Sequence, residues 1–355
     1  MTRHSIQWQN LPAKRLLAQA DLAAQWDTLN AARSKLPFLS AYAMAAALGV
    51  FGNGDERLLV ARQGTHVVAM FLLQRCATAR WQTFQPSQIP LGAWVAAPEL
   101  ALHELAQSLM RGPLGLCLVL SLTQLDPLFA ARAPDGPAWT SADYIDTGWV
   151  EVQGSFEDFW AQRGKNLRSN MRKQRNKLAA ESSAIEFVER RSAAEMADAL
   201  QRFGVMESSG WKSQQGTAIH ADNAQGRFYR ELLEEAGARG EAVVYELLLA
   251  GHTVAANLCL QRGGTLVVLK TAYDESLDKS LSPAFLLQEE QLQRLFATNG
   301  MRRVEYYGRF LEWHSRWTEH KRTLHHMTLY RWPWVKRLRQ LRTPAPAPVA
   351  AAVSA

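Results

Sequence analysis

A block of cationic side chains between Arg163 and Lys177 is the clearest chemical signal in the sequence. Seven of these fifteen positions carry Lys or Arg and none carries an acid, within a chain of formal net charge +7. The segment has strong helix formers and no Gly or Pro after Gly164, so we expect a helix. Arg168, Arg172 and Arg175 would share one face of it. Such a face attracts phosphate, as in a nucleotide cofactor or an RNA backbone, or is an ordinary solvated face.

A second anion site is predicted where a strand over 265–273 leads through a short loop into a helix that begins at Pro283. Ser282 is a plausible N-cap, and Pro suits the first helical position. A helix N-terminus presents unpaired N–H groups and a partial positive charge. Because Ser282 and Ala284 are small, a phosphate could approach the backbone there. The alternative is an ordinary strand–loop–helix connection.

Other chemistries find little support. There is no G-x-S-x-G motif, and three widely spaced cysteines predict buried, reduced thiols. No spacing typical of a metal site joins the later histidines: His220, His314, His320, His325 and His326. No apolar run is long enough to span a membrane, and the N-terminus lacks the pattern of a signal peptide. We therefore expect a cytoplasmic protein without a metal.

The order of predicted elements repeats along the chain. Each half should contain a hairpin, a helix and a further strand, and in the second half a third strand follows the hairpin. The strands are predicted at 57–62, 66–74, 114–122, 243–249, 253–261, 265–273 and 303–307, and the helices at 98–110, 193–206 and 283–297. This order predicts an α/β (α+β) fold of two units, each with its own mixed, mostly antiparallel sheet flanked by helices. We place the domains at 1–150 and 151–340, followed by a disordered Pro/Ala-rich tail at 343–355.

Five segments of the second half carry a resemblance to a known family. They are 164–173 (GKNLRSNMRK), 207–212 (ESSGWK), 270–274 (KTAYD), 282–284 (SPA) and 306–308 (YYG). In order and spacing they resemble the GNAT-fold acetyltransferase domain of CelD-like proteins of bacterial polysaccharide biosynthesis, over about 156–331. The first half resembles the degenerate GNAT-like partner seen in that family and in Fem-type aminoacyl transferases.

The resemblance implies an enzyme that transfers an acyl group from acetyl-CoA or another acyl-CoA to an amine or hydroxyl. The implied acceptor is a polar small molecule or a sugar-containing precursor, in cell-surface polysaccharide biosynthesis. Family members bind pyrophosphate through a Gly-rich loop, whereas the equivalent stretch here, 278–284, has no glycine. Two alternatives stay open: a Fem-type transferase that uses aminoacyl-tRNA, and a non-enzymatic RNA-binding or scaffold protein. Nucleic acid is not the favoured partner, although Arg163–Lys177 offers it a surface, and the sequence does not indicate an oligomeric state.

The same resemblance assigns candidate roles to individual residues. The cofactor is expected along the strand and the start of the helix, at Thr271, Ala272, Tyr273, Ser282, Ala284 and Phe285. The acceptor is expected to meet Trp211, Lys212, Lys270, Arg168 and Arg172. The catalytic candidates are Glu207, Asp274 and Tyr307, with Glu305 as a rival, and the sequence does not choose a general base among them.

Overall fold

The computed structural model describes residues 6–181, 185–209, 219–220 and 223–342. The first half contains β1 (Gln7–Pro12), α1 (Lys14–Ala18), α2 (Ala20–Arg33), a 3-10 turn η1 (Pro37–Leu39), α3 (Ala41–Phe51), β2 (Arg57–Gln63), β3 (His66–Ala77), β4 (Arg80–Thr83), β5 (Trp94–Ala96), α4 (Leu102–Arg111), β6 (Val119–Leu125) and β7 (Trp139–Glu151). The second half contains α5 (Phe156–Ala161), α6 (Lys165–Ala180), β8 (Ile185–Arg190), α7 (Ala193–Ser209), α8 (Ala224–Ala238), β9 (Ala242–Leu249), β10 (His252–Arg262), β11 (Thr265–Tyr273), α9 (Pro283–Phe296), β12 (Arg303–Glu305), α10 (Glu312–Ser315), β13 (Lys321–Tyr330) and α11 (Pro333–Arg342).

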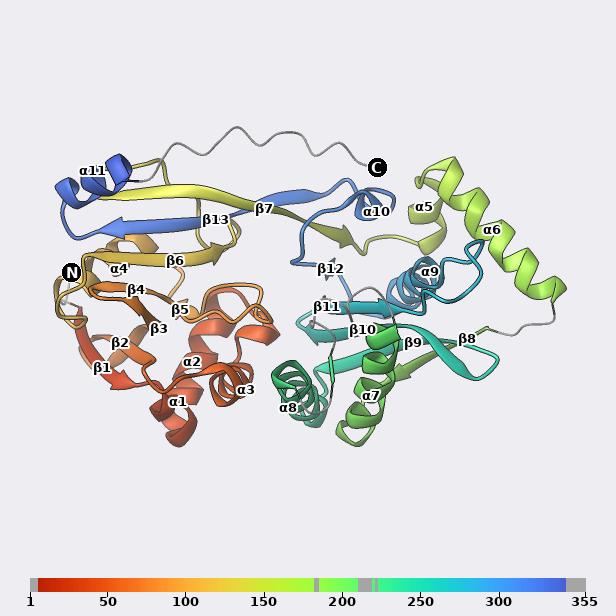
Figure 1. The fold of residues 1–355 in the computed structure, drawn as a ribbon, viewed down its shortest axis with the longest axis horizontal. Helices are drawn as coiled ribbons and strands as arrows, with labels where there is room; N and C mark the ends of the chain where they lie inside the picture. Colours follow the sequence, from red (N-terminus) through yellow and green to blue (C-terminus); the bar gives the residue numbers. More distant parts are fainter. Residues whose placement is uncertain (1–5, 182–184, 210–218, 221–222, 343–355) are drawn as a thin grey trace.

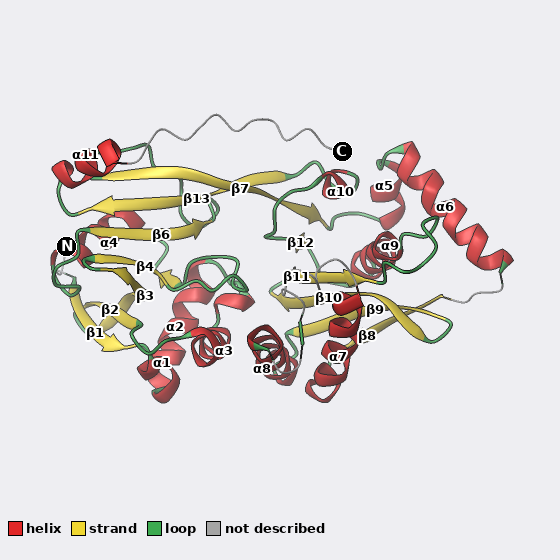
Figure 2. Ribbon diagram, viewed as in Figure 1, coloured by secondary structure: helices red, strands yellow, loops and turns green. Residues whose placement is uncertain are grey.

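The mixed α/β fold is confirmed, with helices on both faces of mostly antiparallel strands (Figures 1 and 2). Local signals explain why the hairpins were predictable. Gly263 and Gly264 link β10 to β11 with φ angles of 57° and 81°, the left-handed pair that a two-residue hairpin turn requires. Pro283 stands in the first turn of α9, as expected.

The two halves do not keep separate sheets, which differs from the expectation. β7 pairs with β13 from Trp139 to Gly148 and then with β12 from Trp149 to Glu151. The strands therefore form one path in the order β1-β2-β3-β4-β6-β13-β7-β12-β11-β10-β9-β8. β13 comes late in the chain yet lies in the first half, between β6 and β7 (Figure 1). The division into 1–150 and 151–340 stays a prediction, and this returning strand crosses it.

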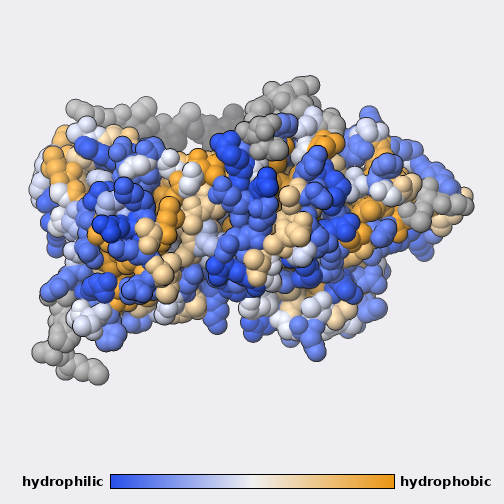
Figure 3. Space-filling model, turned by 90° about the horizontal axis from the view of Figure 1, so that it is seen from below, coloured by the Kyte–Doolittle hydropathy of each residue, from blue (hydrophilic) through white to orange (hydrophobic). Residues whose placement is uncertain are grey.

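Helices α3 and α8 bring the two halves into contact beneath the sheet (Figure 2). The rings of Phe51 and Phe228 lie 5.3 Å apart there, and the Tyr42 hydroxyl donates to Glu241 at 3.0 Å. One hydrophobic cluster contains buried residues of both halves, for example Trp26 of the first half and Leu258 of the second. A band of hydrophilic side chains crosses the middle of the face shown in Figure 3. The halves thus share a core that holds them together, with polar side chains at its rim.

Two smaller expectations are corrected. The first-half helix begins at Leu102 rather than near Pro98, because Ala101 is extended at φ −73° and ψ 121°. Cys117 and Cys259 are buried, but Cys76 is exposed near the end of β3. Among the described helices, none has the length and apolar character needed to cross a membrane.

Candidate active site

Strands β11 and β12 run side by side only briefly and then part. Their parallel pairing begins at Thr265–Arg303 and ends at Val267–Glu305. β11 continues to Tyr273, whereas the chain after Glu305 turns toward β7, where the Tyr306 N–H donates to the Gly148 carbonyl at 3.2 Å. Beyond Val267 this edge of β11 has no strand partner among the described residues, and we call the unpaired edge the opening. A strand edge can hydrogen-bond an extended ligand.

One face of β11 carries a charged pair at this opening. Lys270 Nζ lies 3.1 Å from Glu207 Oε2 of α7 and 3.4 Å from Gln225 Oε1 of α8. The same ammonium lies 5.7 Å from the centre of the Tyr229 ring. The sequence singled out Glu207 and Lys270 for different roles, and the structure brings them together as an ion pair.

The local backbone explains why Glu207 is held so firmly. Gly204 lies almost one turn earlier in α7, and a Cβ there would meet the Ile219 carbonyl oxygen at 2.7 Å. The glycine therefore lets the Ile219 backbone rest on the helix, and the Ile219 N–H donates to Glu207 Oε2 at 2.9 Å. The Glu207 side chain is 1% exposed and that of Lys270 is 18% exposed. A carboxylate this buried needs such partners to remain ionised.

The opposite face of β11 is tied to α9 by buried amides. Thr271 Oγ1 donates to Asn257 Oδ1 at 2.6 Å, and the Asn257 amide donates to Gln291 Oε1 of α9 at 2.6 Å. These bonds fix the helix against the strand whose edge lines the opening. Sequence reasoning missed Asn257 and Gln291, although an Asn inside the apolar run 253–261 was a visible signal.

The loop between β11 and α9 uses several of its own N–H groups. The Ser276 N–H donates to Asp274 Oδ1 at 2.8 Å, and the Ser280 N–H donates to Asp278 Oδ1 at 2.8 Å. The Ser282 N–H donates to Gln174 Oε1 of α6 at 2.7 Å. Asp274 therefore caps a turn.

A pyrophosphate of coenzyme A at this loop would have to replace the hydrogen bonds that the Ser276, Ser280 and Ser282 N–H groups make in this conformation. Two carboxylates and an amide oxygen occupy N–H groups that a phosphate would need, and carboxylates repel a phosphate. Lys177 donates to Asp278 and to Ser280 Oγ, and its hydrogen bond lowers the pKa of the Asp278 carboxyl to about 2. The edge of β11 offers backbone groups to the amide arm of such a cofactor, whereas the loop would have to give up its own hydrogen bonds to take the pyrophosphate.

The basic helix α6 lies across α9 and this loop. Arg175 donates to Glu289 Oε2 at 2.6 Å and to Glu290 Oε1 at 2.7 Å, so it anchors α6 to α9. Arg168 and Arg172 stay exposed, and Arg168 donates to the Arg163 carbonyl oxygen at 3.1 Å. The shared face expected for Arg168, Arg172 and Arg175 is thus divided between packing and solvent.

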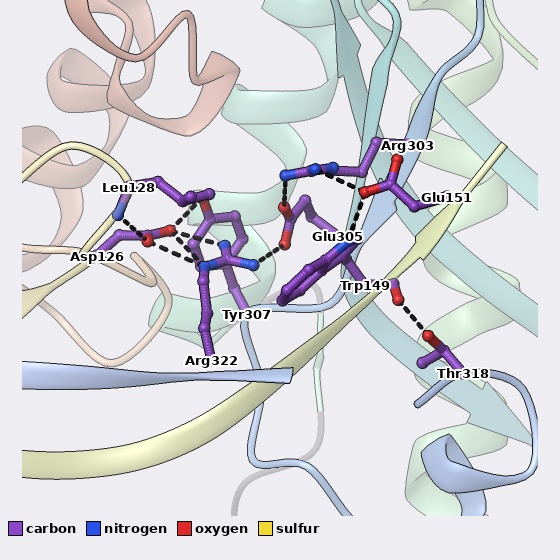
Figure 4. A network of polar contacts seen from close by, with 9 residues as sticks. All are labelled: Asp126, Leu128, Trp149, Glu151, Arg303, Glu305, Tyr307, Thr318 and Arg322. Carbon is purple, nitrogen blue, oxygen red and sulfur yellow. Dashed lines mark hydrogen bonds and ion pairs between the residues drawn. The ribbon is translucent and has the colours of Figure 1, made fainter. Parts of the chain in front are cut away.

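Tyr307 is held in a buried polar network between the halves (Figure 4). It has a left-handed φ of 51°, and its hydroxyl donates to Asp126 Oδ2 at 3.1 Å. Arg322 of β13 donates to the same Asp126 oxygen at 2.7 Å and places Nη1 2.9 Å from Glu305 Oε2. Burial raises the pKa of the Tyr307 phenol well above its usual 10. Asp126 and Arg322 were not among the sequence candidates.

Glu305 stands where β11 and β12 part. Burial raises the pKa of its carboxyl to about 7, although Arg322 acts in the opposite direction. Arg303 Nη1 lies 3.4 Å from Glu305 Oε1, and Arg303 also donates to Glu151 at 2.7 Å (Figure 4). A raised pKa is one property of a general base, but the Glu305 side chain is 3% exposed and is held by Arg303 and Arg322.

The remaining candidates lie in different surroundings. Ala272 is buried in the shared core, and Tyr273 is exposed at the end of β11. Ala284 lies in the first turn of α9, where the neighbouring Phe285 ring packs 5.7 Å from that of Trp317. Trp211 and Lys212 fall outside the described residues. Within the described ranges, no group of three or more His, Cys, Asp or Glu side chains could hold a metal ion.

Comparison with known proteins places this site in a recognised domain. Residues 165–312 match the family described as acetyltransferase (GNAT) domain. No curated protein matched the sequence.

Solved structures resemble most of the chain in fold. The C-terminal domain of a protein assigned as a lysylphosphatidylglycerol synthetase from Agrobacterium fabrum aligns with a TM-score of 0.55 at 12% identity, over 90% of this chain and 95% of that one. FemX aligns with a TM-score of 0.57 at 8% identity, over 90% and 98%. A conserved protein of unknown function from Bacteroides thetaiotaomicron aligns with a TM-score of 0.52 at 12% identity, over 87% and 97%.

The domain match covers α6 to β12, and therefore includes the opening, the Glu207–Lys270 pair and the loop before α9. The likeness to FemX extends the fold resemblance over both halves. A match to the CelD-like family is not among these findings. Residues 165–312 match the acetyltransferase (GNAT) domain family, and this match supports assignment of the chain as an acyltransferase.

Proposed function

We propose that the chain transfers an acyl group from acetyl-CoA or another acyl-CoA to an amine or hydroxyl. The acceptor we propose is a polar small molecule or a sugar-containing precursor of a cell-surface polysaccharide, modified in the cytoplasm. The parting of β11 and β12 beside the start of α9 carries this proposal. It offers a strand edge for an extended amide arm and a helix N-terminus at one end of the same opening.

The residues at the opening suit this reaction. The donor supplies an activated acyl group, so the protein must position the acceptor and remove one proton from it. Glu207 of α7 and Glu305 of β12 are buried carboxyls beside β11. Lys270 lies at the end of its ion pair nearer solvent, where it can meet an acidic group of the acceptor.

Release of a free thiol from acyl-CoA tests the proposal directly. We expect thiol release that requires both an acyl-CoA and an acceptor, screened over amino sugars, hydroxylated sugars and small amines. The Glu207→Gln and Glu305→Gln variants should separate the two bases, because only the variant that lacks the base loses kcat without a matching rise in KM. No acceptor-dependent thiol release with any acyl-CoA would contradict the proposal.

The occupied loop favours a second candidate, transfer from aminoacyl-tRNA. Asp274, Asp278 and Gln174 take N–H groups that a pyrophosphate would use, whereas Arg168 and Arg172 remain exposed on α6. A donor held through a nucleic-acid backbone would need that exposed surface rather than the loop. Binding to aminoacyl-tRNA with a log–log salt slope of several units, weakened by Arg168→Ala and Arg172→Ala, would favour this candidate. Salt-insensitive binding of acyl-CoA would favour the first.

A further inference from the structure

Helix α11 lies at the outer edge of the first half (Figure 1), and large apolar side chains of this helix are exposed. Its inner side is anchored to the body of the protein. Val335 is buried there, and Lys336 Nζ donates to the Gly136 carbonyl at 2.8 Å and to the Trp139 carbonyl at 3.0 Å. The orientation of the helix is therefore fixed, and its other side faces away from the fold.

The outward side carries large apolar residues at helical spacing. Trp334, Leu338 and Leu341 stand at i, i+4 and i+7 and are 53%, 50% and 84% exposed. Trp332, just before the helix, is also exposed, and its ring stacks on that of Trp334 at 5.6 Å. Exposed Leu116 lies in a loop that Arg331 contacts, since Arg331 Nη1 donates to the Gly115 carbonyl at 3.0 Å. We call these five side chains the α11 patch.

Two arginines flank the α11 patch. Arg331 lies beside Trp332, with its guanidinium carbon 5.3 Å from the ring centre, and Arg337 is exposed on the helix. The sequence from His320 to Ala355 contains no Asp or Glu. An apolar patch flanked by arginines would repel a second copy of itself, because a two-fold interface brings the same charges face to face. It complements a surface that is apolar beneath a layer of negative charge.

We propose that the α11 patch docks on the surface of a bilayer that contains anionic phospholipid. Tryptophan rings and leucines enter the boundary between head groups and acyl chains, while arginines meet lipid phosphates. The helix lies in the plane of the surface and does not span it. The docking is independent of the acyl donor and the acceptor, and it would hold the enzyme beside acceptors that are made or assembled at a membrane.

Vesicle binding by the full chain tests the docking. We use vesicles of phosphatidylcholine alone and vesicles in which about one lipid in three is phosphatidylglycerol. We expect binding to the anionic vesicles, a blue shift of tryptophan fluorescence, and quenching by lipids brominated on their acyl chains. Arg337→Glu should weaken binding about tenfold or more, since each cation near such a surface contributes about fivefold in affinity.

Matched variants distinguish docking through the α11 patch from non-specific binding to vesicles. Trp334→Glu/Leu338→Glu places acids on exposed positions, so the fold should survive, as circular dichroism will show, and vesicle binding should be lost. Leu17→Glu is the control, because Leu17 is 47% exposed on α1, away from this helix. Three outcomes would overturn the proposal: equal binding to both vesicle types, equal loss in the Leu17→Glu control, or a dimer in solution that the double variant dissolves.

Discussion

The ion pair between Glu207 and Lys270 joins α7 to β11 and holds a buried carboxylate beside that strand. Both were visible as unusual, since Lys270 stands in an apolar strand and Glu207 ends a helical pattern. Their contact depends on how α7 docks on β11, and on Gly204, which lets the Ile219 backbone approach the helix. Sequence periodicity predicts each element but not which residues of two distant elements meet.

Removing one partner of this pair should cost more than removing both. Lys270→Met leaves the buried Glu207 carboxylate without its ammonium, and we expect the free energy of unfolding to fall by about 3 kcal/mol. Glu207→Gln/Lys270→Met should recover most of that stability but not activity. Urea unfolding and thiol-release assays on the single and double variants measure both quantities. A double variant with full activity would remove the pair from the reaction.

Glu305 should give stability a distinct pH dependence. Its pKa is raised in the folded state to about 7 from an ordinary 4.5, so the folded protein binds its proton more tightly than the unfolded chain. That contribution is complete below about pH 4.5 and is lost as pH rises to about 7. Glu305→Gln should therefore gain stability relative to the parent across this window, as measured by Tm. A constant difference in Tm would show that Glu305 does not titrate there.

The boundaries of strands and helices were predictable where a Gly or Pro residue marks the start of the element. β11 matches its predicted span because Gly263 and Gly264 precede it, and α9 begins at Pro283 as predicted. β7 and β13 were not predicted, because their partners lie far away in sequence and no local turn joins them. The use of loop N–H groups by Asp274 and Asp278 was equally hidden, since it depends on loop conformation.

Asp278 should restrain donor binding at the loop before α9. Asp278→Asn removes a carboxylate near the start of the helix and releases Lys177 from its ion pair. If the loop holds a pyrophosphate, the affinity for acyl-CoA should rise several-fold and should weaken with added salt. Asp158→Asn, at the start of α5, is the control in the same titration. Equal affinities for all three proteins would place the pyrophosphate elsewhere.

The two halves share one path of paired strands and one hydrophobic cluster. β13 completes the sheet of the first half, and one core contains residues from both halves. The network of Asp126, Arg322, Glu305 and Tyr307 joins β6, β13 and β12 at the same junction. The division into 1–150 and 151–340 stays a prediction, and the shared sheet and core lead us to expect that the two halves unfold together.

A cavity in β13 should therefore destabilise both halves together. Leu329 is fully buried between β6 and β7, and Leu329→Ala should cost about 2–5 kcal/mol. Hydrogen exchange should show the same loss of protection in β2 and β3 as in β9 and β10. Leu17→Ala, at an exposed position, should change neither set. Loss confined to β2 and β3 would mean that the halves unfold separately.

A donor site between β11 and the start of α9 can be tested by titration of an unreactive acyl-CoA analogue into the parent and two glutamate variants. Ala284→Glu places an acid in the first turn of α9 beside the opening, where an acid favours the helix but repels a phosphate. Ala297→Glu makes the same change at the exposed far end of that helix. We predict that the parent and Ala297→Glu bind the analogue with equal affinity. The affinity of Ala284→Glu should be at least about tenfold lower, which is a loss of about 1.4 kcal/mol of binding free energy. Equal binding by all three would contradict a donor site between β11 and the start of α9.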